Sequence, residues 1–296
     1  MILSYEPKDL PVARVHEILL GTVAPRPIAW ASTVDKEGRV NLAPFSFFNV
    51  FGSNPPILVF SPNRRVRDNT SKHTLENIEL TRECVINIVN YELCGQMVLS
   101  SAEYDEGVNE FIKAGLSMEP SLKVKAPRIL EAPAQYECIV RDIIHTGDGG
   151  GAANLIICEV VHMHVNDHIF NEEGKIDPVK VDNVARMGGI WYSRAEKGLF
   201  QMPNPKGRSN IGFDGMPEFI IHSKFLNGWD ISAMAGLPSL PTSEEVNQYK
   251  SEASALALIN QYSGDQLISA THEKAKILIR EGHPQEALVL LLAIGV

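Results

Sequence analysis

The stretch PRPIAWASTVDKEGRVNLAPFSFFNVFGSNPPILVFS, residues 25–61, has the composition of a β-hairpin followed by a loop rich in hydroxyl and amide groups. Residues 28–34 are largely apolar or β-branched, residues 35–38 favour a turn, and residues 39–42 resume extended chain. Residues 46–49 then place aromatic faces beside a hydroxyl and an amide. A flat ring with polar edges and a phosphate tail binds to such a mixture of side chains. The stretch therefore predicts a hairpin that leads into a loop suited to a ligand of this kind.

Several motifs follow one another in a recognisable order. Residues 25–33 are PRPIAWAST, residues 41–48 are NLAPFSFF, and residues 55–61 are PPILVFS. This order resembles the flavin reductase-like family of FMN-binding split barrels, which includes flavoredoxins and reductase components of nitrilotriacetate monooxygenases. The resemblance covers about residues 10–210. It implies a split β-barrel that binds FMN.

The next motif departs from the family pattern at one position. Residues 72–78 are KHTLENI, where family members usually carry KDTLxNI with the Lys and Thr near the FMN phosphate. The resemblance therefore implies phosphate contacts for Lys72 and Thr74, whereas His73 does not inherit a role from the usual aspartate. The preceding residues 63–70 form a lengthened loop with three arginines, in which Arg67 and Asp68 are candidates to replace that aspartate.

The resemblance also implies which residues surround the cofactor. Residues 185–192, ARMGGIWY, resemble the R-x-G-G-x-x-Y element that closes the barrel near the flavin. Hydride transfer to a flavin requires positioning rather than a protein acid or base, so no catalytic residue is assigned. The implied cofactor-binding residues are Arg26, Pro27, Ile28, Ala29, Ser46, Phe47, Phe48 and Asn49 for the ring, Ser32, Thr33, Arg67, Lys72 and Thr74 for the ribityl phosphate, and Arg186 and Gly189 in the closing element.

Each of these residues also has a purely structural interpretation. Phe47 and Phe48 fit core aromatics, Ser32 and Thr33 fit ordinary strand residues, and Lys72 fits a solvated residue at a helix N-terminus. Only the ordered family motifs favour the binding interpretation.

Composition limits the partners and the location. The net charge of −9 disfavours nucleic acid, because such binding requires a basic face. Charged residues interrupt the first twenty positions, which argues against a signal peptide. The longest apolar run, residues 287–296, is too short to cross a bilayer. We therefore expect a cytoplasmic protein without a nucleic-acid or membrane partner.

The order of predicted elements favours an antiparallel barrel, mainly β with peripheral helices. The glycine-rich residues 147–152 precede a β-rich run, so they predict a hairpin turn instead of a dinucleotide fingerprint. The expected strands are residues 28–34, 40–44, 56–61, 84–89, 134–144 and 154–165, and the expected helices in this part are residues 11–20, 74–83 and 93–101.

Cysteine and histidine spacing gives no firm metal signal. Cys84, Cys94, Cys138 and Cys158 lack C-x-x-C spacing, which favours reduced thiols that are mostly buried. His162 and His164 share a strand face, but no further ligand at matching spacing completes a metal site. We therefore expect no bound metal.

Three domains are expected along the chain. Residues 1–210 form the barrel, residues 211–240 a loop-rich arm, and residues 241–296 a helical extension. Thr242 begins the extension with a capping-box pattern, and apolar residues recur at helical spacing in residues 252–262, 266–281 and 284–294. A single helical pair is too little to define a repeat protein.

The function expected from the resemblance is FMN-dependent oxidoreduction, with NADH or NADPH as a transient reductant. A homodimer is implied, with an oxygenase or another electron acceptor as a further partner. Two alternatives stay open at this point: a non-catalytic module that binds FMN or haem, and a pyridoxamine phosphate oxidase-like enzyme.

Overall fold

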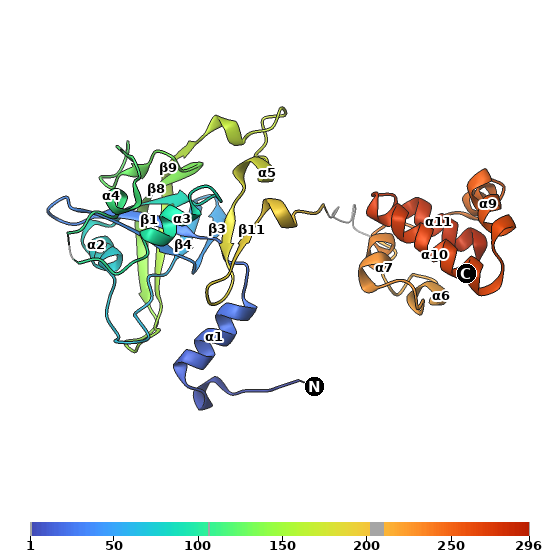
Figure 1. Ribbon diagram of the computed structural model, residues 1–296, viewed down its shortest axis with the longest axis horizontal. Helices are drawn as coiled ribbons and strands as arrows, with labels where there is room; N and C mark the ends of the chain where they lie inside the picture. Colours follow the sequence, from blue (N-terminus) through green and yellow to red (C-terminus); the bar gives the residue numbers. More distant parts are fainter. Residues whose placement is uncertain (1, 106, 202–209, 296) are drawn as a thin grey trace. The chain divides into compact units, whose positions relative to one another are not determined.

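The computed structural model describes residues 2–105, 107–201 and 210–295. The chain divides into two compact units, Met1–Leu199 and Phe200–Val296. Figure 1 shows strands mainly in the first unit and helices in the second, and each unit has a hydrophobic core of its own.

The first unit contains a seven-stranded sheet in the order β2-β1-β5-β8-β9-β4-β3, with every neighbouring pair antiparallel. This confirms the predicted mainly β architecture. Strands β8 and β9 form the long hairpin expected around the glycine-rich turn (Figure 1). The strands are β1 (Ala29–Val34), β2 (Val40–Phe45), β3 (Phe48–Ser53), β4 (Pro56–Phe60), β5 (Glu83–Ile88), β8 (Ala134–His145) and β9 (Asn154–Val165).

Helices and short strands surround this sheet. Short antiparallel pairs form between β6 and β7 and between β10 and β11. The helices are α1 (Val12–Thr22), α2 (His73–Thr81), α3 (Cys94–Leu99), α4 (Glu110–Ala114) and α5 (Pro178–Val181), with 3-10 turns at Pro7–Asp9, Asp167–Ile169 and Glu196–Gly198; the short strands are β6 (Met118–Glu119), β7 (Arg128–Ile129), β10 (Val184–Arg186) and β11 (Tyr192–Arg194).

Strand β1 is buried along its whole length, in agreement with its mostly apolar sequence, and its two polar residues, Ser32 and Thr33, are buried as well. Ala29 and Ala31 belong to the core inside the barrel, whereas Trp30 belongs to a second core that includes residues of α3 and α4. The indole Nε1 of Trp30 donates to Ser100 Oγ at 2.8 Å, which satisfies its buried polar atom. Both faces of β1 are thus fixed by packing.

Residues 48–53 differ from the sequence expectation. The hydroxyl- and amide-rich composition predicted a loop, but these residues form β3, which pairs with β4 at one end of the sheet order. Only backbone groups make the ladder, so polar side chains are compatible with such an edge strand. Val50 and Phe51 are consequently exposed on β3.

The second unit is helical. Thr242 begins α8 with the predicted capping box: its hydroxyl accepts from Glu245 N at 3.2 Å, and its own N–H donates to Glu245 Oε2 at 2.7 Å. Helices α10 and α11 pack against each other. The helices are α6 (Glu218–Ile221), α7 (Gly228–Ala235), α8 (Ser243–Lys250), α9 (Ala253–Gln261), α10 (Gly264–Arg280) and α11 (Pro284–Ile294).

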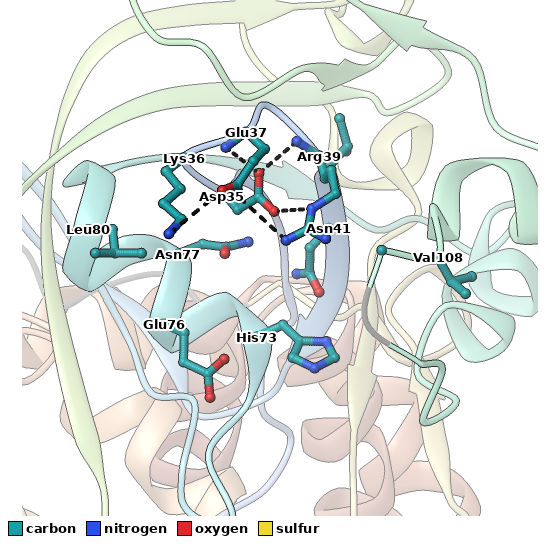
Figure 2. Close-up of a pocket in the computed structure, with 12 residues that line it drawn as sticks. Asp35, Lys36, Glu37, Arg39, Asn41, His73, Glu76, Asn77, Leu80 and Val108 are labelled. Carbon is teal, nitrogen blue, oxygen red and sulfur yellow. Dashed lines mark hydrogen bonds and ion pairs between the residues drawn. The ribbon is translucent and has the colours of Figure 1, made fainter.

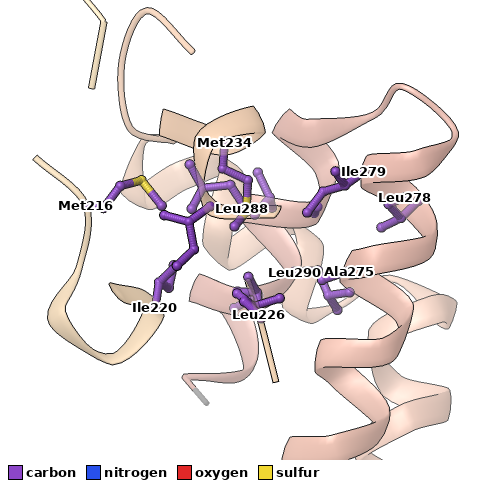
Figure 3. Close-up of a cluster of buried hydrophobic side chains, with 14 of the residues drawn as sticks. Met216, Ile220, Leu226, Met234, Ala275, Leu278, Ile279, Leu288 and Leu290 are labelled. Atoms are coloured by element: carbon purple, nitrogen blue, oxygen red, sulfur yellow. The ribbon is translucent and has the colours of Figure 1, made fainter. Parts of the chain in front are cut away.

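The segment expected as an arm, residues 211–240, contributes to the core of the helical unit. Met216, Ile220 and Met234 are buried in one cluster with Leu288 and Leu290 of α11 (Figure 3). Ile220 lies on the short helix α6 and Met234 on α7, whereas Met216 precedes α6, and the brevity of these helices conceals the 3.6-residue periodicity in the sequence. Residues 211–240 and the later helices therefore share one core.

The cysteines are all free thiols, and Cys84, Cys138 and Cys158 are buried in the barrel core, as predicted. The sulfur atoms of Cys84 and Cys158 lie 3.8 Å apart. In the described part of the chain, no helix is both long enough and apolar enough to cross a bilayer.

Candidate functional site

A surface hollow lies where the N-terminus of α2 meets β2 and the segment after α3. Its lining is mostly polar and includes the cations Arg65 and Lys72 and the carboxylates Glu103 and Glu110. The lining residues are Asn41, Ala43, Pro44, Arg65, Lys72, His73, Thr74, Ser100, Ser101, Ala102, Glu103, Tyr104 and Glu110.

Lys72 is the cation most withdrawn from water in this hollow. Its Nζ lies 5.1 Å from the centre of the Phe45 ring, within cation–π range. Burial lowers the pKa of Lys72, the positive charge of Arg65 lowers it further, and Glu103 opposes both effects. A partly desolvated ammonium group of this kind gains free energy from a bound anion.

The N-terminus of α2 adds a second attraction for an anion. Lys72 is the N-cap residue, and no side chain caps the helix. The first N–H groups of a helix lack intrahelical partners and carry the positive end of its dipole. Asn41 Nδ2 donates to Thr74 Oγ1 at 2.9 Å, so the Thr74 hydroxyl is held at this helix start.

Residues 63–70 place Arg65, instead of Arg67, at the hollow. Arg65 Nη1 donates to Thr70 Oγ1 at 2.7 Å and to the Ser71 carbonyl at 2.6 Å. Arg67 is 71% exposed and pairs with Asp68 at 2.9 Å. From the sequence Arg67, next to Asp68, was the candidate, and nothing in the lengthened loop singled out Arg65.

This loop is fastened to the turn between β8 and β9. Arg64 N donates to the Ala152 carbonyl at 3.0 Å, and Gly151 N donates to the Arg64 carbonyl at 3.0 Å. A Cβ atom at Gly150 would lie 3.1 Å from the Arg65 and Val66 carbonyl oxygens, so a glycine permits the close approach. The glycine-rich turn thereby supports the arginine loop.

The predicted strand residues Ser32 and Thr33 are fully buried and bonded within the protein. Ser32 Oγ donates to the Pro127 carbonyl, and Thr33 Oγ1 accepts from Asn77 Nδ2 at 3.0 Å. Ile28 and Ala29 are also buried, in the two cores on either face of the sheet. The structure does not bring these four side chains to the hollow at α2.

A second group of predicted residues gathers around Arg26. Arg26 Nη1 donates to the Leu20 carbonyl at 2.6 Å, and Arg26 Nε approaches Ser46 Oγ at 3.5 Å. Its Nη2 is buried without a partner in the described part of the chain. Burial lowers the pKa of Arg26, and the nearby charge of Arg186 lowers it further. This corner therefore concentrates positive charge.

The closing element lies beside this corner. The backbones of Arg26 and Arg186 form an antiparallel bridge, and the Arg186 guanidinium lies 4.5 Å from the centre of the Tyr192 ring. Gly189 occupies the turn between β10 and β11 with φ of 55°, a conformation that favours glycine.

The remaining predicted residues lie at or near the surface. Phe48 is partly buried against the barrel core, whereas Pro27, Phe47 and Asn49 are exposed. The Phe47 ring contacts His16 of α1 edge-on, with centroids 6.4 Å apart. An exposed aromatic side chain of this kind remains accessible to a flat ligand.

A second hollow adjoins the hairpin turn between β1 and β2 (Figure 2). Asn41 and His73 line both hollows. Here the charged side chains pair with one another: Arg39 contacts Asp35 at 2.5 Å, and Lys36 lies 3.7 Å from Glu37. These pairs leave this hollow less suited to an anion than the one at Lys72.

His164 has a structural partner. Its Nε2 lies 2.6 Å from Oε1 of Glu137, whose side chain is fully buried. The ring of His162 lies next to that of His164, with centroids 4.7 Å apart. Among the described residues, no group of three or more His, Cys, Asp or Glu side chains has a metal-binding arrangement.

The comparison with protein families identifies the barrel unit. Residues 20–180 match the family model described as "Flavin reductase like domain". The chain belongs to the flavin reductase-like family. The barrel is therefore the split barrel expected from the motifs, and the family links it to flavin-dependent oxidoreduction.

Individual relatives agree with this assignment. An uncharacterized protein of Aquifex aeolicus (strain VF5) is 40% identical over 181 residues, which cover 61% of this chain and 90% of that protein. Nitrilotriacetate monooxygenase component B from Bacillus cereus has 27% identity and a TM-score of 0.63, covering 69% of this chain and 98% of its own. The 2-nitrobenzoate 2-nitroreductase NbaA of Pseudomonas fluorescens has 27% identity and a TM-score of 0.60. This match covers 70% of this chain and 99% of the NbaA chain.

These relatives are covered almost completely, whereas about a third of this chain lies outside the alignments. The family match ends at residue 180, before the helical unit begins. The helical unit is thus an addition to the family domain.

Proposed function

We propose that this chain binds FMN and uses it to transfer electrons from NADH or NADPH to a further acceptor. The observation that supports this most strongly is the hollow at α2, where Lys72 and Arg65 lie beside a helix N-terminus that no side chain caps. Two cations and free helix N–H groups form a donor set that suits a phosphate monoester.

Specific residues would hold the cofactor. Lys72, Arg65 and Thr74 would bind the phosphate, with the first N–H groups of α2. The exposed Phe47 and the positive corner at Arg26 would contact the ring and its polar edge. When bound, FMN would supply the ability to accept a hydride and to release electrons singly or in pairs. The protein would contribute position and electrostatics, without an acid or base of its own.

We also infer a homodimer from an apolar surface of the barrel unit. None of the residues of α1 is buried, and Leu19 on this helix is exposed. A Cβ atom at Gly188 would lie 3.3 Å from the Cα of Gly21, so the β10–β11 turn packs against the end of α1. Ile190 and Trp191 in this turn are 86% and 73% exposed. A second copy of the chain would cover this surface.

The class of electron acceptor is proposed from a structurally similar protein. The Bacillus cereus protein is a component of a monooxygenase. An oxygenase that consumes reduced flavin is therefore the class of partner that we infer for this chain.

Flavin titration tests the proposal. The full chain should bind FMN, and Lys72→Met should weaken FMN binding by about 1–3 kcal/mol, the contribution of a hydrogen bond to a charged group, without changing riboflavin affinity. Lys36→Met, at the neighbouring hollow of Figure 2, is the matched control and should change neither affinity. Equal losses of FMN and riboflavin binding in Lys72→Met would contradict the phosphate assignment.

Turnover assays separate the enzyme from the two alternatives. With FMN present, NADH or NADPH should be oxidised, as followed by loss of nicotinamide absorbance. FMN binding without nicotinamide oxidation would indicate a non-catalytic module. Oxidation of pyridoxamine phosphate would indicate the other alternative, a pyridoxamine phosphate oxidase-like enzyme.

A further inference from the structure

The hollow at α2 contains an anion supplied by the chain itself. Glu103, in the segment after α3, places Oε1 3.2 Å from Arg65 Nε and Oε2 3.0 Å from Arg67 Nη2. Its side chain also lines the hollow together with Lys72. Its negative charge partly counteracts the depression of the Lys72 pKa by burial and Arg65, which places the carboxylate within electrostatic range of both cations.

The bonds of Arg65 leave little room for a second anion while Glu103 is in place. Arg65 Nη1 is committed to the loop through Thr70 and Ser71, and Arg65 Nε faces Glu103. A carboxylate and a phosphate both bind a guanidinium group through charge-assisted hydrogen bonds. A phosphate that binds Arg65 in a bidentate manner would use its Nε–Nη2 edge, because Nη1 is committed to the loop, and it would therefore compete with Glu103 for the Nε–H.

The pairing of Glu103 with the arginines is weak enough to be broken. The Glu103 side chain is 56% exposed, and that of Arg67 is 71% exposed. Solvent-exposed ion pairs stabilise proteins only slightly, because water and salt screen the charges. A phosphate dianion is also attracted by Lys72 and by the N-terminus of α2. It should therefore bind Arg65 more strongly than the Glu103 carboxylate does.

We propose that Glu103 competes with the flavin phosphate for Arg65 and thereby lowers the affinity of the chain for FMN. This inference rests on the proposed placement of the phosphate at Lys72. In the free chain Glu103 holds Arg65, and this pair must break before Arg65 can bind the phosphate. FMN held in this way exchanges more readily than FMN bound by the same cations alone, as a flavin that is passed to a partner must.

Removing the charge of Glu103 tests this competition in the full-length protein. Glu103→Gln should bind FMN about three- to tenfold more tightly, because an exposed ion pair no longer has to be broken to free Arg65, and riboflavin affinity should stay the same. Glu173→Gln is the matched control, since it removes the same charge and breaks an exposed ion pair with Lys175 away from the hollow. It should leave both affinities unchanged.

A double-mutant cycle tests whether Glu103 acts through Arg65. In an Arg65→Gln background, Glu103→Gln should lose most of its effect on FMN. If Glu103→Gln increased FMN affinity equally with and without Arg65, Glu103 would not compete for Arg65 and the proposal would be overturned. Weaker or unchanged FMN binding in Glu103→Gln alone would also overturn it, since Glu103 would then position Arg65 instead of competing for it.

The same titrations distinguish this inference from the proposed function. If Lys72→Met weakens FMN binding selectively while Glu103→Gln does not strengthen it, only the role of Glu103 is overturned. If neither variant discriminates FMN from riboflavin, the phosphate does not bind in this hollow and both proposals are overturned.

Discussion

Lys72 and Phe45 connect the candidate phosphate site to the barrel core. The Lys72 Nζ lies 5.1 Å from the centre of the Phe45 ring, and Phe45 is itself buried inside the barrel. The orientation of a surface cation thus depends on a core aromatic residue.

Replacing this aromatic face should weaken phosphate binding selectively. Phe45→Leu keeps an apolar side chain but removes the ring, so FMN affinity should fall by about 0.5–1 kcal/mol, the value of a partly exposed cation–π contact. Riboflavin affinity should not change. Phe60→Leu is the control, because the Phe60 ring packs against Phe45 at 5.4 Å within the same core. Equal effects of the two variants on FMN affinity would show that general core packing matters, and not the contact with Lys72.

The pair formed by buried Glu137 and partly buried His164 predicts a pH-dependent stability of the barrel. Burial alone would raise the pKa of Glu137, but N–H bonds from Leu122 and Lys123 and the contact with His164 hold it below its ordinary value. This stabilisation is fully present above the unfolded carboxyl pKa of about 4.3 and is lost as the pH falls through the lower folded pKa. Urea unfolding of the full chain should therefore show a free energy that decreases on acidification in this range.

Glu137→Gln isolates this contribution. The variant should lose about 1–3 kcal/mol of unfolding free energy near neutral pH, because buried charge-assisted hydrogen bonds are removed, and its stability should depend less on acid. Glu159→Gln is the control, because it breaks a more exposed ion pair between Glu159 and Arg141 on the neighbouring strand. It should lower the unfolding free energy by less than about 1 kcal/mol. An unchanged acid profile in Glu137→Gln would assign the pH dependence to other groups.

The unit boundary predicts opposite outcomes for two truncations. A chain ending at Leu199 retains the whole barrel unit and should stay soluble, with FMN affinity within about tenfold of the full chain, or about 1.4 kcal/mol. A chain ending at Leu240 keeps Met216, Ile220 and Met234 but lacks α11, so their buried surfaces become exposed and it should aggregate. Size-exclusion chromatography measures the aggregation of each truncated chain, and FMN titration measures its affinity. Loss of FMN binding by a soluble chain ending at Leu199 would make the helical unit part of the site.

In our proposal, the homodimer forms through the apolar surface of α1. Leu19→Glu places a charge on this surface and should shift the light-scattering mass from dimer towards monomer, raising the dissociation constant at least about tenfold, or about 1.4 kcal/mol. Ile112→Glu changes an even more exposed apolar residue on α4 and should leave the mass unchanged. A dimer unaffected by Leu19→Glu would place the interface elsewhere.

The sequence by itself was sufficient for the family, for every strand of the large sheet except β3, and for several helix boundaries. The order of the motifs from residue 25 to residue 192 predicted a flavin reductase-like barrel, and the family match confirms it. The hairpin at the glycine-rich turn and the capping box at Thr242 were also predicted correctly. All of these depend on neighbouring residues, whose spacing and conformational preferences are local.

Tertiary structure decided which side chains meet. Ser32 and Thr33 carry family motif positions, yet their hydroxyls are bonded inside the protein because strand alternation and helix packing determine where each points. Residues 211–240 look irregular in sequence but are buried against α11, which only the packing of distant helices reveals.

The contact between Arg65 and Glu103 illustrates the same limit at the candidate site. Of the three arginines in the lengthened loop the sequence favoured Arg67, and nothing near them indicates Glu103 as a partner. Docking of the loop on the β8–β9 turn directs Arg65 to the hollow, where the segment after α3 brings Glu103 to it. The sequence thus determined that cations gather near α2, whereas folding determined which cation faces the hollow and which anion opposes it, because long-range packing sets side-chain direction.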